Sequence, residues 1–112
     1  MRKGDLVRLS ATAQHSAFRH LAEDERQAWL LEFQEDVRQG RERWHDDAGE
    51  PRLVPRSVTV MPTPGRLHIV LRARVRAAYN YQPCEGLCEV VDPESGVTFF
   101  VSRADTSPLE IT

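Results

Sequence analysis

The feature that most constrains the fold is a period-two alternation from Gly65 to Tyr79, which reads GRLHIVLRARVRAAY. Alternate residues of a strand face opposite sides of a sheet, so this stretch predicts a central, half-buried strand. The predicted inner face is apolar throughout and comprises Leu67, Ile69, Leu71, Ala73, Val75 and Ala77. The predicted outer face is mostly cationic and comprises Arg66, His68, Val70, Arg72, Arg74 and Arg76. The sequence therefore predicts a sheet with one apolar face.

One helix is predicted from Glu25 to Gln39. Asp24 is suited to be its N-cap, with Gln27 at the reciprocal position of a capping box, and Gly40 is suited to end it. Apolar side chains recur at spacings of three and four residues, at Trp29, Leu30, Phe33 and Val37. This spacing is typical of an amphipathic helix.

Shorter strands are predicted at Lys3–Ser10, Ser57–Met61, Leu87–Asp92 and Val97–Ser102. The turn formers at 62–65 predict a hairpin between the second of these and the long strand, and those at 93–96 predict a hairpin between the last two. In the last strand, Phe100 is expected on the nominally polar face, opposite Phe99. The tail is expected to form a turn at Asp105–Ser107 and an extended contact through Leu109 and Ile111.

These elements predict an α+β fold in a single domain spanning residues 1–112, the length of one ordinary domain. The expected architecture is a small antiparallel, partly open β-barrel or curled sheet of about five strands. One main amphipathic helix is inserted after the first strand. The composition, with 40% apolar and 29% charged residues, is that of a globular chain rather than a disordered one.

Several stretches together resemble the Src-homology-three-like small β-barrels that occur in many bacterial and phage proteins. They are KGDLVRL near the start, the long strand, the hairpin LCEVVDPESGVTFFV and a short turn before PLEI. The predicted helix departs from this family, because such a barrel normally has only a loop after its first strand. The resemblance implies a barrel-like topology but no functional residues, since these barrels bind many kinds of partner.

The net charge of −2 conceals a strong segregation of charge along the chain. Glu23–Glu50 contains ten acidic and four basic residues, whereas Pro51–Cys84 contains six arginines and no acidic residue. Blocks of opposite sign either pair with one another or face separate partners. The sequence leaves both alternatives open.

The residues that most often carry catalysis or metals are few and unfavourably spaced. Cys84 and Cys88 are four residues apart, but a zinc site needs about four ligands, and the histidines have no matching spacing (His15, His20, His45, His68). Two reduced cysteines are therefore expected rather than a metal site or a disulfide. No elbow motif or third catalytic member accompanies Ser16 or the cysteines. We expect no enzyme activity, cofactor or metal.

The start of the chain lacks the apolar core of a signal peptide, and its uncharged apolar runs are only a few residues long. A cytoplasmic location without a membrane partner is therefore expected.

The leading hypothesis is a small non-enzymatic interaction protein of a phage or other mobile element. It would bind and inhibit a host protein or protein–nucleic-acid complex, in the manner of anti-CRISPR proteins. The acidic run can imitate a phosphate backbone in a basic groove. The contact residues expected on this hypothesis are Glu32, Glu35, Asp36, Asp46 and Asp47. The competing interpretation is a solvated helix face without a partner.

The alternative hypothesis is a nucleic-acid-binding module that uses the cationic face of the long strand. Arginines next to aromatic residues are what a single-stranded nucleic-acid platform uses to hold phosphates and stack bases. The residues expected to take part are Arg66, His68, Arg72, Arg74, Arg76, Tyr79 and Tyr81. Here the competing interpretation is that the acidic helix or solvent satisfies the arginines.

Overall fold

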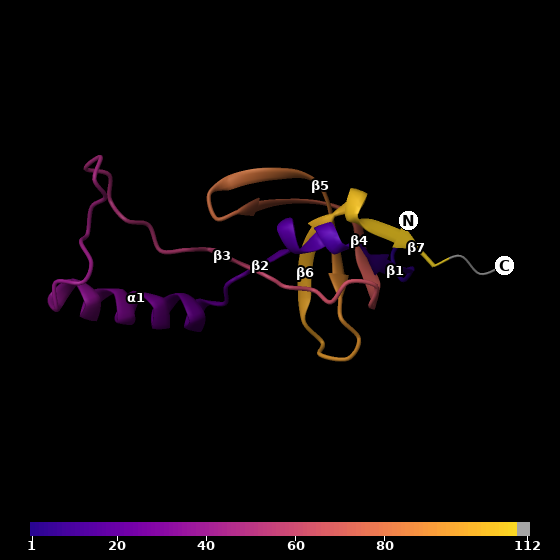
Figure 1. Ribbon diagram of the computed structural model, residues 1–112, viewed down its shortest axis with the longest axis horizontal. Helices are drawn as coiled ribbons and strands as arrows, with labels where there is room; N and C mark the ends of the chain where they lie inside the picture. Colours follow the sequence, from indigo (N-terminus) through magenta and orange to yellow (C-terminus); the bar gives the residue numbers. More distant parts are fainter. Residues whose placement is uncertain (110–112) are drawn as a thin grey trace. The chain divides into compact units, whose positions relative to one another are not determined.

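The computed structural model describes residues 1–109 and contains two compact units. One unit is formed by Met1–His20 together with Ser57–Thr112, and the other by Leu21–Arg56. The first contains an antiparallel sheet, and the second contains an α-helix with a long return segment (Figure 1). The α+β class is thus confirmed, and the single domain stays a prediction.

The sheet has seven strands in the order β3-β2-β6-β5-β4-β1-β7, and every neighbouring pair is antiparallel. The strands are β1 (Leu6–Leu9), β2 (Phe18–His20), β3 (Ser57–Thr59), β4 (Leu67–Tyr79), β5 (Gln82–Val91), β6 (Thr98–Ser102) and β7 (Thr106–Pro108). Two 3-10 helices, η1 (Ala11–His15) and η2 (Arg103–Asp105), connect them. The expected count of five was too low because the short strands β2 and β7 were not predicted.

Within residues 1–109 the edge strands β3 and β7 do not pair with each other, so the sheet does not close into a barrel. The predicted hairpin between β3 and β4 is wrong. β3 pairs with β2 instead, with Phe18 opposite Thr59 and His20 opposite Ser57. The predicted β5–β6 hairpin is confirmed, with Val91 opposite Thr98.

The side-chain alternation of β4 changes face part of the way along the strand. Its register against β5 shifts at three places, which are between Val70 and Arg72, between Arg72 and Val75, and between Val75 and Ala77. A bulge adds one residue to one strand, which moves every later side chain to the opposite face. The prediction of one uniform inner face is therefore wrong.

The predicted position of His68 is wrong. This residue lies in the core rather than on the cationic face. Its side chain is 1% exposed, and Val70 is fully buried beside it. The Nδ1 atom of His68 lies 3.2 Å from the carbonyl oxygen of Arg66, and its ring meets Phe99 edge-on at 5.3 Å. Burial of the polar ring is tolerated because one nitrogen has a hydrogen-bond partner.

Apolar side chains are buried on both faces of the sheet. The larger cluster contains Val7, Leu9, Ala13, Ala17, Val70, Cys88, Val90, Phe99 and Val101. The smaller cluster contains Phe18, Leu87 and Phe100, with Val75, Ala77 and Cys84 packed against it. Phe99 and Phe100 are consecutive and belong to different clusters, so the predicted placement of Phe100 opposite Phe99 is confirmed.

Asp105 in η2 joins the two 3-10 helices. Its carboxylate accepts hydrogen bonds from Thr12 Oγ1 at 2.5 Å, Ser16 Oγ at 2.9 Å and Ser10 Oγ at 3.2 Å. The hydrogen bond from Thr12 is the main cause of a lowered pKa of Asp105, and partial burial opposes it. The turn expected at Asp105–Ser107 lies at Arg103–Asp105 instead. Leu109 N donates to Leu6 O, whereas Ile111 lies outside the described residues.

Replacing Asp105 with asparagine is expected to destabilise the protein at pH 7 by about 1–2 kcal/mol, because charge-assisted hydrogen bonds are lost. The lowered folded-state pKa of Asp105 means that its carboxylate stabilises the fold above the unfolded pKa. That contribution is lost as the pH falls through the folded pKa. Urea unfolding from pH 7 to pH 2 should therefore show a smaller acid-induced loss for Asp105→Asn. The exposed Asp47→Asn variant should keep the wild-type profile.

The helix α1 (Glu23–Arg38) confirms the predicted helix with slightly different ends. Its N-cap is Ala22 rather than Asp24, and the Glu25 carboxylate accepts the Ala22 N–H at 3.1 Å. Alanine has no side-chain acceptor, so only this half of a capping box forms. Gly40, at a φ of +77°, ends the helix as predicted. The helix follows β2 rather than β1.

The helix packs against its own return segment through an aromatic cluster. Phe33 stacks on Trp29 at 4.9 Å and meets Trp44 edge-on at 5.4 Å. None of the helices in residues 1–109 has the length and apolar character needed to cross a membrane.

Candidate functional site

The register shifts between β4 and β5 divide the predicted arginine stripe between the two faces of the sheet. Arg72 and Val75 lie opposite Glu89 and Leu87, which are two positions apart on β5 and so share a face. Arg74 and Arg76 flank Val75 and therefore face the other way. The stripe is not the continuous row that the sequence predicts.

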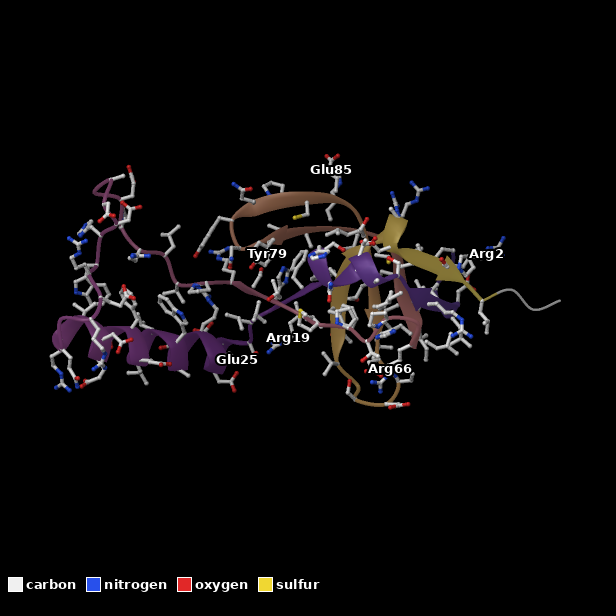
Figure 2. The ribbon with its side chains drawn as sticks, in the orientation of Figure 1. Arg2, Arg19, Glu25, Arg66, Tyr79 and Glu85 are labelled. Carbon is white, nitrogen blue, oxygen red and sulfur yellow. The ribbon has the colours of Figure 1, made fainter. Side chains whose placement is uncertain are left out.

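Two of the stripe's arginines are neutralised within the sheet unit. Arg72 Nε lies 3.1 Å from Glu89 Oε1 on the neighbouring strand. Arg66 pairs with Glu94 and lies 3.3 Å from Asp92 Oδ1, beside the β5–β6 turn (Figure 2). The charges of Arg66 and Arg72 are thus neutralised by carboxylates of the same protein, as expected on the interpretation that the arginines have internal partners. That interpretation named the acidic helix as the partner, whereas these partners belong to β5 and its following turn.

Arg74 and Arg76 instead line a groove of about 860 Å³ together with Arg103 of η2. Within residues 1–109, no ion pair involves any of these three arginines. The groove, called here the arginine groove, also has Glu85 in its wall. Figure 2 shows the Glu85 side chain pointing away from the β4–β5 hairpin. Three unpaired guanidinium groups in one groove favour an anionic ligand.

A second hollow of about 430 Å³ adjoins the arginine groove, because Cys84, Glu85 and Leu87 line both. Phe18 and Tyr79 also line it, and their rings meet edge-on at 5.4 Å. Tyr79 is 37% exposed. We call this hollow the aromatic pocket. Alternation along β4 places Tyr79 on the face of Val75, opposite to that of Arg76.

The structure therefore separates the predicted nucleic-acid residues into three groups. Arg74, Arg76 and Tyr79 line the two adjoining hollows. Arg66 and Arg72 are paired, and His68 is buried. Tyr81 lies in the turn after β4 and is 45% exposed. Arg103 was missed, because it is an isolated arginine in the sequence and only the chain path brings it to the groove.

Most of the predicted acidic contact residues have partners within the helical unit. Glu35 pairs with Arg38, Asp36 with Arg41 at 2.7 Å and Asp47 with Arg43 at 2.9 Å. The Asp46 carboxylate accepts the backbone N–H groups of Ala48 and Glu50, which shapes the loop. Glu32 lines a hollow of about 420 Å³ beside Trp29 and Phe33. Local pairing thus reduces the negative electrostatic potential that these carboxylates present to a partner.

The two cysteines lie in different surroundings. Cys88 is fully buried, and burial raises the pKa of its thiol to about 11 although nearby Arg103 opposes the shift. Cys84 is half-buried in the wall of both hollows. A protonated, buried thiol is a poor nucleophile and metal ligand, so Cys88 is suited to a packing role. In residues 1–109, no cluster of three or more histidine, cysteine or acidic side chains is placed to hold a metal ion.

No family model matches this sequence, and no curated protein or solved structure matches it either.

Proposed function

We propose that this protein is a non-enzymatic binding protein whose sheet unit binds single-stranded nucleic acid in the arginine groove. The observation that carries the proposal is the convergence of Arg74, Arg76 and Arg103 on one groove with no ion pair to any described carboxylate. Like charges held together repel each other, and a phosphate backbone relieves that repulsion. Binding also releases the counterions condensed on the nucleic acid, which favours association at low salt.

A single strand fits this site better than an isolated anion does. Alternate residues of a strand, such as Arg74 and Arg76, are about 6 to 7 Å apart, so they can contact successive phosphates. Arg103 adds a third cation from a different element. Tyr79 lines the aromatic pocket, which shares Cys84, Glu85 and Leu87 with the groove.

The test is a fluorescence-anisotropy titration of a labelled single-stranded oligonucleotide at several salt concentrations. We expect binding at low salt, with log K falling linearly against log salt with a slope of about −2. That value follows from three neutralised phosphates at about 0.7 each for a single strand. Undetectable binding at low salt would contradict the proposal.

A second candidate function is the protein-binding inhibitor of phage or mobile-element origin inferred from the sequence. A separate observation favours a protein contact on the helical unit: Leu31, Trp44 and Leu53 are 67%, 46% and 59% exposed. This unit carries ten acidic and six basic residues. Exposed apolar side chains among acidic ones suit a partner surface that is basic at its rim and apolar at its centre. The cytoplasmic location and the Src-homology-three-like resemblance stay predictions.

Replacing Glu32, Glu35 and Asp36 with lysine is expected to abolish retention of a host partner in a pull-down from a host lysate, because the sign of the contact surface is reversed. Circular dichroism should show that the helix is retained. A Glu85→Lys variant, altered in the sheet unit, should retain the partner. Undiminished capture by the triple variant would contradict this second function.

A further inference from the structure

We infer that Asp105 is a positioning residue for the arginine groove, because it holds η2 in the place from which Arg103 reaches that groove. The inference rests on the proposed function and adds to it the contacts that fix the third cation. Arg103 is the first residue of η2, which spans only Arg103–Asp105. A single turn of 3-10 helix has few internal hydrogen bonds, so its position depends on contacts with other elements.

Asp105 is tied to a segment distant in the sequence, residues 10–16. One carboxylate oxygen accepts hydrogen bonds from Thr12 Oγ1 at 2.5 Å and Ser10 Oγ at 3.2 Å, and the other accepts from Ser16 Oγ at 2.9 Å. The backbone carbonyl of Asp105 accepts the N–H of Ser10 at 2.9 Å. Hydrogen bonds to an ionised carboxylate are stronger than those between neutral groups, so this network anchors the end of η2 firmly.

Arg103 is held from both sides by the same network. The Ser16 hydroxyl donates to Asp105 and accepts the backbone N–H of Ser102 at 3.4 Å. Thr106 Oγ1 donates to the carbonyl oxygen of Arg103 at 2.8 Å. The backbone of Arg103 is thereby fixed, while its side chain lines the groove and has no ion pair within residues 1–109.

The sign of the effect of Asp105→Asn separates a positioning role from an effect of charge. The substitution removes a negative charge from the short helix that carries Arg103, and by charge alone it would strengthen the binding of an anionic strand. An amide has only one acceptor oxygen, so it cannot accept from Thr12 and Ser16 on both sides as the carboxylate does. If Asp105 positions Arg103, the looser η2 weakens binding instead.

The test is a fluorescence-anisotropy titration of labelled oligo(dT) across a salt series, with circular dichroism to verify that each variant is folded. Asp105→Asn and Ser16→Ala should each weaken binding about two- to fivefold and make the slope of log K against log salt shallower by up to about 0.7, the share of one phosphate contact. Ser16→Ala leaves the net charge unchanged, so charge cannot explain its effect. Glu85→Gln removes a negative charge from the groove wall and should strengthen binding.

An Arg103→Ala background completes a double-mutant cycle. There, neither Asp105→Asn nor Ser16→Ala should weaken binding further, because the contact that they position is already absent. Equal weakening in that background would show that Asp105 supports the fold in general and would overturn the inference. Unchanged or tighter binding by Asp105→Asn in the otherwise wild-type protein would overturn it as well. Both results leave the arginine groove standing, whereas absence of binding by the wild-type protein would overturn the proposed function itself.

Discussion

Replacing Arg74, Arg76 and Arg103 together with alanine is expected to weaken oligonucleotide binding by about one to two orders of magnitude at low salt. The slope of log K against log salt should become shallower by about 2, because three fewer counterion-releasing contacts form. These side chains line one groove and have no ion pair within residues 1–109, so their removal leaves no carboxylate unpaired. Anisotropy titrations of the variant and the wild type across the same salt series measure both quantities.

The stretch from Arg66 to Arg76 offers a matched control for this experiment. Arg66→Ala with Arg72→Ala removes two positive charges, as Arg74→Ala with Arg76→Ala does. The first pair is neutralised by Glu94 and Glu89, whereas the second lines the groove. We expect only the second double variant to change the salt slope markedly. Equal effects of the two double variants would mean that binding follows net charge and does not use the groove.

Replacing Phe99 with alanine is expected to lower the free energy of unfolding by about 3–5 kcal/mol, the typical cost of truncating a buried phenylalanine. Phe99 is 3% exposed in the larger cluster and contacts the buried ring of His68. Its loss removes apolar contacts and leaves a cavity beside a polar ring. Urea unfolding monitored by circular dichroism measures the change.

Val97→Ala is the control for this core substitution, since Val97 is 41% exposed just before β6. Its effect should stay within about 0.5 kcal/mol. Phe100→Ala should be costly as well, because Phe100 is 7% exposed and packs on Phe18 at 5.3 Å from the opposite face. A loss below about 1 kcal/mol for Phe99→Ala would contradict the assignment of this residue to the main core.

The elements that local signals dominate were predictable from the sequence. The helix ends at Gly40, where glycine accommodates the positive φ, and its apolar residues recur with the helical period. The β5–β6 hairpin follows from the turn formers between two apolar runs. The short strands β2 and β7 were missed because they are defined by pairing with strands distant in the sequence, β2 with β3 and β6 and β7 with β1.

The candidate site was only partly predictable, since side-chain direction in β4 depends on its register with β5. Without the bulges, His68 and Arg72 would share one face with Arg74 and Arg76, as the period-two pattern suggests. With them, His68 is buried, Arg72 meets Glu89, and Arg74 and Arg76 line the groove. A bulge is a property of two paired strands, so the sequence of one strand does not reveal it.

The sequence by itself determined the α+β composition, the long strand, the helix and the segregation of charge, because each depends on residues that are close in the chain. Only the tertiary structure decided which arginines are neutralised and which converge. Arg103 is 27 residues from Arg76 in the sequence and reaches the same groove because β5 and β6 return the chain to that end of the sheet. Long-range strand pairing sets that proximity, and no local pattern encodes it.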